Sequence, residues 1–167
     1  MALTENLLKS IKKAMQGEMD SVTLYKSAAA HTTDPSVKDF FARRGEEERE
    51  HYNYLLQYYQ EISNDLVPTD LSVTMGGTQE YNPIISESFL KRIGQDQILF
   101  SAISTALLLE KDAIDHYRKC MEETDLLTLK SFFGIMVKWE THHYEDLLLI
   151  QKDAEVHYWE INQFEPF

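Results

Sequence analysis

The sequence repeats one arrangement of glutamate and histidine in its two halves. Each half carries an isolated glutamate and, thirty positions later, the first residue of a Glu-x-x-His motif. The six residues are Glu18, Glu48, His51, Glu110, Glu140 and His143. Four carboxylates and two imidazoles in this internally symmetric order are the ligand set of a two-metal site inside a four-helix bundle. The repeat therefore constrains the fold and the chemistry together.

The repeat extends beyond these ligand candidates. When residues 3–58 are aligned with residues 95–150, 15 of the 56 positions are identical. Chance identity at ordinary composition would give about three or four. The rarer residue types match as well as the leucines, as Tyr25 and Tyr117 show. Two helical hairpins related by an internal two-fold explain this pattern better than a generic resemblance between amphipathic helices.

Hydrophobic spacing predicts an all-α fold with four long helices. Apolar residues recur at threes and fours in four segments, at about 4–30, 35–64, 86–123 and 126–156. Asp34 and Pro35 suit the N-cap and the first position of the second helix. The linker at about 65–85 contains Gly76-Gly77 and is too long for a hairpin turn. Short turns within two hairpins and one long crossover between them predict a ferritin-like up-down four-helix bundle.

Size and composition favour a single domain over residues 1–167. The net charge of −12 argues against a nucleic-acid partner, since phosphates need Lys and Arg. Cys120 is the only cysteine, so neither a disulfide nor a Cys-x-x-Cys module is expected. No apolar stretch suits a signal peptide or a membrane span, so we expect a cytoplasmic protein without a membrane partner. The aromatic tail at 157–167 is expected to pack on the bundle or on a partner chain.

Both isolated glutamates lie on the apolar stripe of their helices. Glu18 falls between Ala14 and Val22 at helical spacing, and Glu110 occupies the same place in its own helix. Burying a carboxylate is costly unless something pairs with it. In each Glu-x-x-His motif, the two side chains point from one helix face toward one spot. All six ligand candidates are therefore expected to face the interior of the bundle.

Four glutamates in a dry core need neutralisation, because like charges at close range raise several of their pKa values. Two divalent cations would balance the four carboxylates. Mixed oxygen and nitrogen ligands suit Fe or Mn better than Mg or Ca. The alternative is a set of buried salt bridges with basic residues nearby in the sequence: Arg43, Arg44, Arg49 and Lys111. Salt bridges alone, however, do not require a histidine at the same offset in both halves.

Tyr25 and Tyr117 are candidate supporting residues of the site. Each follows the isolated glutamate of its half by seven positions, on the same helix face. Each could donate a hydrogen bond to a ligand carboxylate on a neighbouring helix; an ordinary core tyrosine is the alternative. Other polar residues are expected outside the site: Asp20, Asp112, His31, His116, His142, His157 and Cys120.

These residues resemble the diiron domain of the rubrerythrin family, within the ferritin-like superfamily. The resemblance rests on both Glu-x-x-His motifs together with both isolated glutamates, and on the strings at 46–51 and 109–115. The ending at 157–167 is similar to that of short-form rubrerythrins, which lack a rubredoxin module. The resemblance implies a non-haem diiron centre held by the six ligand candidates, with Mn or Zn as alternatives to the two Fe ions.

The resemblance implies a diiron oxidoreductase that reduces hydrogen peroxide or oxygen with electrons from a separate donor protein. A ferroxidase or other iron-handling protein is the first alternative. A metal-stabilised interaction protein without turnover is the second. We also expect a homodimer.

One position departs from the family pattern. A typical rubrerythrin carries a further glutamate where this chain has Ala113, one turn after Glu110. Asp115 is two residues beyond and is expected to point elsewhere on a straight helix, although a local helical bulge could bring it to the site. The departure implies a more symmetric metal site and slower peroxide reduction than in a typical family member.

Overall fold

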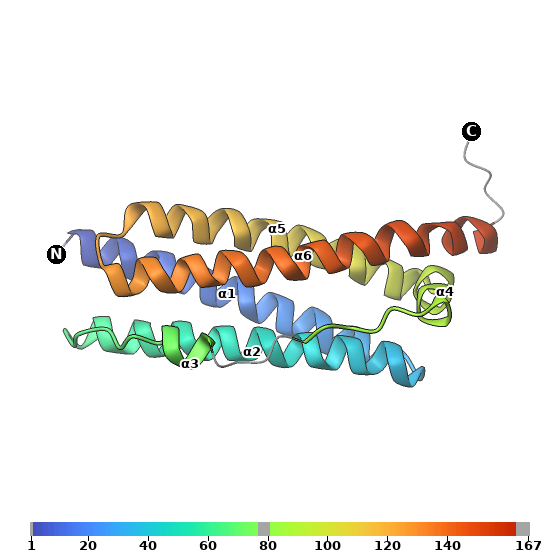
Figure 1. Cartoon of the computed structure of the whole chain (residues 1–167), viewed down its shortest axis with the longest axis horizontal. Coiled ribbons are helices and arrows are strands. Elements are labelled where there is room, and N and C mark those ends of the chain that lie inside the picture. The colour runs from blue at the N-terminus through green and yellow to red at the C-terminus, as the bar shows by residue number, and fades with distance from the viewer. Residues whose placement is uncertain (1, 77–80, 163–167) are drawn as a thin grey trace.

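The computed structural model describes residues 2–76 and 81–162, and over these residues it contains helices and no strand. The helices are α1 (Ala2–His31), α2 (Pro35–Ser63), α3 (Ser72–Gly76), α4 (Glu87–Gln95), α5 (Gln97–Glu123) and α6 (Leu127–Asn162). Four long helices form a bundle in which α1 with α2, and α5 with α6, make antiparallel hairpins (Figure 1). The all-α, ferritin-like bundle predicted from the sequence is confirmed.

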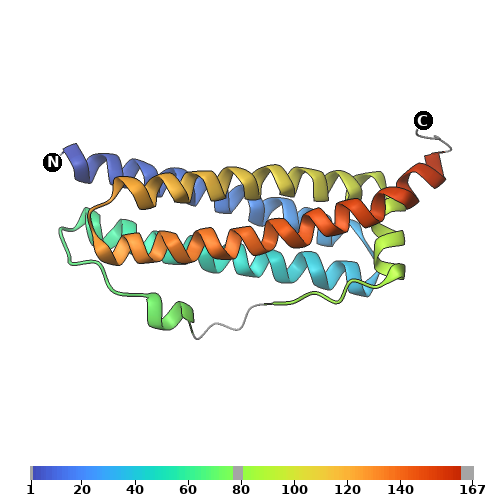
Figure 2. The ribbon, with the colours of Figure 1, turned by 45° about the horizontal axis from the view of Figure 1, so that its top comes forward.

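The segment between α2 and α4 returns along the length of the bundle (Figure 2). Because of this return, α5 runs in the same direction as α2. The short helix α3 lies on the path, and Leu71 and Met75 at its two ends are buried. The crossover predicted at about 65–85 is therefore present. Its residues 77–80, which include the predicted turn residue Gly77, lie outside the described residues.

Side-chain caps define where α2 and α4 begin. Asp34 accepts a hydrogen bond of 3.1 Å from the backbone N–H of Ser36, and Pro35 is the first residue of α2. The predicted start of this helix is confirmed. Ser86 caps α4 in the same way, by accepting the N–H of Phe89 at 3.1 Å. Such caps satisfy N–H groups that have no partner within the helix.

The third helix predicted from the sequence is in fact two helices. The backbone is extended at Asp96 (φ −112°, ψ 111°), and its carboxylate accepts the N–H groups of Ile98 and Leu99. Helix α4 therefore turns across the end of the bundle (Figure 2). Gly94 permits its close approach to α6, because a Cβ there would lie 2.3 Å from the Ala154 carbonyl oxygen. The apolar spacing does not reveal this break, which depends on a cap and an interhelix contact.

The fourth helix is longer than predicted. The apolar spacing predicts a helix that ends at about residue 156, followed by a tail at 157–167, but α6 continues to Asn162. Tyr158 in this extension stacks on Phe100 of α5, with ring centroids 4.7 Å apart. The first part of the predicted tail therefore packs on the bundle as helix. Residues 163–167 lie outside the described residues.

The core consists of two apolar clusters on either side of a polar layer. One cluster contains Phe40 and Phe41 near the start of α2. The other contains Phe132 and Phe133 near the start of α6. The starts of α2 and α6 lie toward opposite ends of the bundle (Figure 1), as an internal two-fold requires. Glu18, midway along α1, marks the layer between the clusters.

Candidate metal centre

The bundle brings all six ligand candidates into one layer of its core. Helices α1 and α5 each contribute one glutamate, and α2 and α6 each contribute a Glu-x-x-His pair: Glu18, Glu110, Glu48 with His51, and Glu140 with His143. None of these residues is more than 4% exposed. Carboxylates at this depth require neutralising partners.

The ligand atoms fall into two overlapping groups. The first is Glu18, Glu48, His51 and Glu140, and the second is Glu48, Glu110, Glu140 and His143. Within each group, one ligand atom per residue lies within 4.8 Å of the others. Glu48 and Glu140 belong to both groups, so each faces both halves of the layer. The repeat in the sequence is thus reproduced as two adjoining sets of ligand atoms.

Both histidines direct Nδ1 toward the shared glutamates. His51 Nδ1 lies 2.8 Å from Glu140 Oε1 and 3.1 Å from Glu48 Oε2. His143 Nδ1 lies 2.9 Å from Glu48 Oε1 and 3.5 Å from Glu140 Oε2. The imidazole rings are nearly parallel, with an interplanar angle of 14° and centroids 5.7 Å apart. Each shared glutamate therefore presents one oxygen to each histidine.

Several of these short contacts are not aligned as hydrogen bonds. Glu48 Oε1, Glu140 Oε1 and His143 Nδ1 are buried and have no hydrogen-bond partner within the described part of the chain. A buried polar atom left without a partner costs roughly 1–3 kcal/mol, so each such atom in a native protein needs an explanation. Oxygen and nitrogen atoms that converge without bonding one another fit the ligand sphere of a metal ion.

Ionisation divides the four glutamates into two pairs. Burial, reinforced by the charges of Glu48 and Glu140, raises the pKa values of Glu18 and Glu110 well above the usual range. Burial and Glu140 also act to raise the pKa of Glu48, but both imidazoles outweigh them and lower it to about 2. For Glu140, burial is likewise outweighed, chiefly by His51, and the pKa lies well below the usual range.

The same contacts raise the pKa values of both histidines. Burial disfavours the imidazolium form, but the charges of Glu140 and Glu48 outweigh it at His51, and Glu48 leads this effect at His143. Without metal, these directions favour imidazolium forms of both histidines, ionised forms of Glu48 and Glu140, and protonated forms of Glu18 and Glu110. Several raised glutamate pKa values were predicted. The rise falls on two of the four, because only Glu48 and Glu140 contact both imidazoles.

Tyr25 and Tyr117 support the isolated glutamates across the bundle. The Tyr25 hydroxyl donates a hydrogen bond of 2.7 Å to Glu110 Oε1, and the Tyr117 hydroxyl donates to Glu18 Oε1. Burial and the nearby glutamate charges raise the pKa of both tyrosines well above 10.0, so both hydroxyls keep their protons. The predicted hydrogen bond from each tyrosine to a glutamate on a neighbouring helix is confirmed.

Basic side chains do not neutralise the six-residue layer. Arg43 pairs with Asp39, Arg44 with Glu47 and Asp146, and Lys111 with Asp115. Arg49 lies over the ring of Tyr52. Within the described residues, none of these cations forms an ion pair with a ligand candidate. The salt-bridge alternative from the sequence therefore reduces to the two histidines themselves.

Glu47 was not identified as a site residue from the sequence. Its Oε2 atom lies 3.2 Å from Nε2 of His143 and accepts a hydrogen bond of 2.8 Å from Arg44. Trp139 was also missed, and its ring stacks on His51 with centroids 5.3 Å apart and an angle of 22°. The sequence did contain one signal for these two residues, because Glu47 and Trp139 occupy equivalent positions of the repeat, each directly before a glutamate of a Glu-x-x-His motif. Their different chemistry marks where the two halves diverge.

Asp115 does not take the place left by Ala113. Its carboxylate pairs with Lys111 at 2.7 Å, and its side chain is 53% exposed. Helix α5 is continuous across this region. The prediction that Asp115 points away from the site is confirmed.

The other polar residues that the sequence placed outside the site also lie away from the layer. Asp20 accepts a hydrogen bond from Gln16, His31 pairs with Asp96, His157 pairs with Glu87, His142 lies near Asp146, and Asp112 is exposed. His116 contacts the Ser10 carbonyl, and burial raises the pKa of the Cys120 thiol to about 11.

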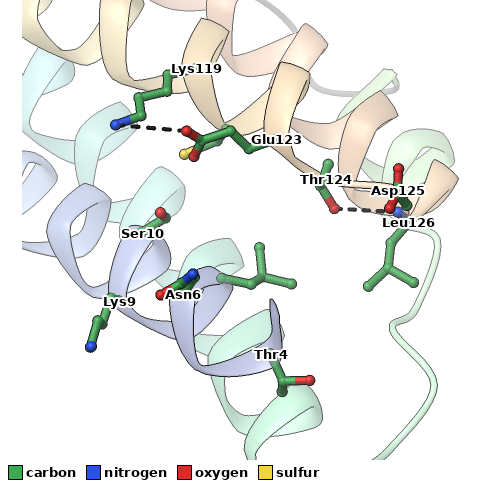
Figure 3. Close-up of a pocket in the computed structure, with 11 residues that line it drawn as sticks. Thr4, Asn6, Lys9, Ser10, Lys119, Glu123, Thr124, Asp125 and Leu126 are labelled. Carbon is green, nitrogen blue, oxygen red and sulfur yellow. Dashed lines mark hydrogen bonds and ion pairs between the residues drawn. The ribbon is translucent and has the colours of Figure 1, made fainter. Parts of the chain in front are cut away.

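Cys120 borders a cavity of about 700 Å³ between the first turns of α1 and the end of α5 (Figure 3). This cavity shares no lining residue with the layer.

A four-helix bundle with a buried layer of four carboxylates and two histidines defines a ferritin-like protein with a candidate metal site. The family model for rubrerythrin matches residues 5–150, a range that includes all six ligand candidates. The chain therefore belongs to the rubrerythrin family. Neither a curated protein nor a solved structure matches the chain in the corresponding comparisons. Among the described helices, none combines the length and the hydropathy needed to cross a membrane.

Proposed function

We propose that the protein is a non-haem diiron oxidoreductase that reduces hydrogen peroxide or oxygen with electrons from a separate donor protein. The observation that carries the proposal is the position of the shared glutamates, each of which presents one oxygen to each histidine. Two carboxylates shared in this way suit two adjoining metal ions. The residues that would hold them are Glu18, Glu48, His51, Glu110, Glu140 and His143.

Charge balance supports two divalent ions in this layer. Without metal, the raised pKa values of Glu18 and Glu110 favour their neutral forms, and the raised pKa values of both histidines favour imidazolium ions that offset the other two carboxylates. Four ionised glutamates with neutral imidazoles carry four negative charges, which two divalent cations balance. Both states are neutral, so metal replaces protons without leaving net charge in the dry core.

The chain's own residues would orient and protect the reacting centre. Burial of all six ligand candidates excludes bulk water from the layer. Tyr25 and Tyr117 hold Glu110 and Glu18 in place through their hydroxyl groups. When bound, two ferrous ions would supply the two electrons with which peroxide, after taking up two protons, is converted to two water molecules.

Anaerobic loading with Fe(II), followed by peroxide titration with and without an external reductant, tests this function. A peroxidase should consume peroxide in excess over its iron only when the reductant is present. Steady consumption of free Fe(II) with a ferric product would instead indicate a ferroxidase. Uptake of two ions without turnover would indicate a metal-stabilised interaction protein. Failure to bind iron would exclude the peroxidase and the ferroxidase, and Glu48→Ala should serve as the metal-deficient control.

A further inference from the structure

The two histidines of the layer have different outer partners, although the six ligand candidates follow the repeat. The Nδ1 atom of His143 faces the shared glutamates, and its Nε2 atom faces Glu47 Oε2 at 3.2 Å. A carboxylate at Nε2 accepts the N–H of that nitrogen and leaves the Nδ1 lone pair directed into the layer. A histidine that binds metal commonly depends on such a partner for its tautomer and orientation.

Glu47 is itself held by two further contacts, from Arg44 and from the backbone of Tyr81. Arg44, which is 1% exposed, donates to Glu47 Oε2 at 2.8 Å and also pairs with Asp146 of α6. The backbone N–H of Tyr81 in the crossover donates to Glu47 Oε1 at 3.4 Å. The Arg44 guanidinium lies 5.4 Å from the centre of the Tyr81 ring. The Glu47 carboxylate is therefore restrained by more contacts than a single exposed ion pair would provide.

Among the residues that the structure describes, the other half of the layer has no equivalent network. The repeat places Trp139 where the first half has Glu47, and Met136 where it has Arg44. His51 packs against the Trp139 ring, and within the described residues its ion pairs with carboxylates involve Nδ1 alone. Stacking restrains the plane of the imidazole but does not accept its N–H. The tautomer of His51 is therefore less firmly determined than that of His143.

We propose that Glu47 is a positioning residue for His143, and that it makes the ion held by His143 bind more tightly than the ion held by His51. The inference rests on the proposed two-metal site and adds a difference in metal affinity between its two halves. Loss of an outer partner of a ligand histidine typically weakens metal binding by about 10–100-fold. Removal of Glu47 should therefore weaken one of the two sites by about this factor and leave the other unchanged.

Zinc(II) titration of wild-type protein, Glu47→Gln and Glu47→Leu, with a competing chelator, tests the proposal. Leucine removes the acceptor and keeps a similar volume, whereas glutamine removes only the charge and should give an intermediate loss. Glu46→Gln is the matched control, because Glu46 is the exposed neighbour in the same helix. In the zinc-loaded protein, ¹⁵N-resolved NMR should show a slowly exchanging His143 Nε2–H in the wild type and rapid exchange in Glu47→Leu.

The outcomes separate this inference from the proposed function. A selective loss at one site, with a normal second site and an unchanged Glu46→Gln protein, supports the positioning role. Equal weakening of both sites, no weakening, or a slowly exchanging Nε2–H in Glu47→Leu overturns it while leaving the two-metal site intact. A wild-type protein that binds fewer than two ions overturns both. If Glu47→Leu does not fold, Arg44→Met/Glu47→Leu is used instead. It also removes the buried guanidinium, which keeps only Asp146 as a carboxylate partner once Glu47 is lost, and it copies Met136 of the other half. The same outcomes apply to this double variant.

Discussion

The hydroxyl of Tyr25 on α1 donates a hydrogen bond of 2.7 Å to Glu110 on α5. Tyr117 on α5 makes the reciprocal contact with Glu18 on α1. These two bonds cross between the hairpins at the level of the polar layer. Each tyrosine therefore positions the glutamate that belongs to the opposite half of the repeat.

Tyr25→Phe and Tyr117→Phe should each destabilise the metal-free protein by about 1–3 kcal/mol, because a buried carboxyl loses its donor. The two effects should be similar, since both tyrosines are 1% exposed. Urea unfolding measures the loss, and zinc titration measures the accompanying fall in metal affinity. Tyr58→Phe is the control, because Tyr58 is equally buried but donates to the Thr69 carbonyl. Metal affinities that change no more than in Tyr58→Phe would mark Tyr25 and Tyr117 as ordinary core residues.

Shared and unshared glutamates should differ in their effect on metal stoichiometry. Glu18→Ala and Glu110→Ala should each cost one of two ions, and to a similar extent, because each residue belongs to a single ligand group. Glu48→Ala and Glu140→Ala should weaken both ions, because these residues belong to both groups. Iron analysis after anaerobic loading and desalting gives the ratio directly. The same loss in all four variants would contradict two overlapping groups.

Metal binding should release protons, because carboxylates must ionise and imidazoles must become neutral to bind. The groups expected to release them are Glu18, Glu110, His51 and His143, whose pKa values are all raised. Zinc titration calorimetry in buffers with different ionisation enthalpies measures the number. A release close to zero would show that the metal-free layer is already deprotonated.

The metal-free protein should lose stability as the pH rises. Glu18 and Glu110 have raised pKa values in the folded state. As the pH rises above about 4.3, these glutamates ionise in the unfolded chain before they ionise in the folded protein, so the free energy of unfolding falls. His51 and His143 also have raised pKa values. Their stabilising contribution is complete below about pH 6.5 and is lost as the pH rises through the folded-state pKa values.

Acid should destabilise the same protein for the opposite reason. Glu48 and Glu140 have lowered pKa values, so the stability that they contribute is present above about pH 4.3 and is lost on acidification toward the folded-state values. Metal-loaded protein should instead gain relative stability above about pH 5, because protons compete with metal for the ligands. Thermal melts of both forms between about pH 5 and about pH 9 measure this divergence. Parallel melting curves would contradict the ionisation states derived for the layer.

Ala113→Glu should raise peroxide turnover and lower the stability of the metal-free protein. The new carboxylate lies one helical turn from Glu110, where it adds a ligand choice but also a negative charge. Steady-state peroxide reduction and thermal melts of the metal-free form measure the two effects. Asp115→Ala is the control and should change neither, because Asp115 is exposed and paired with Lys111. Unchanged turnover in Ala113→Glu would mean that this position does not limit the reaction.

The sequence alone was enough to predict the polar layer. A residue on the apolar stripe of an amphipathic helix must face the core, so Glu18 and Glu110 could be assigned to the interior from spacing. The repeat made coincidence improbable, because both histidines and both tyrosines recur at the same offset. The break at Asp96 was missed, since a cap depends on side-chain hydrogen bonds to backbone, which apolar periodicity does not report.

Tertiary structure alone decided how the atoms of the layer meet. Helical spacing determines which face carries Glu48 and Glu140, but the oxygen that contacts each histidine depends on how the helices pack. Those contacts separate their pKa values from those of Glu18 and Glu110. The role of Glu47 likewise depends on a neighbour on another helix, His143. The periodicity of a sequence shows in which direction each side chain points from the axis of its own helix. Ionisation and hydrogen bonding depend instead on the distances between side chains on different helices.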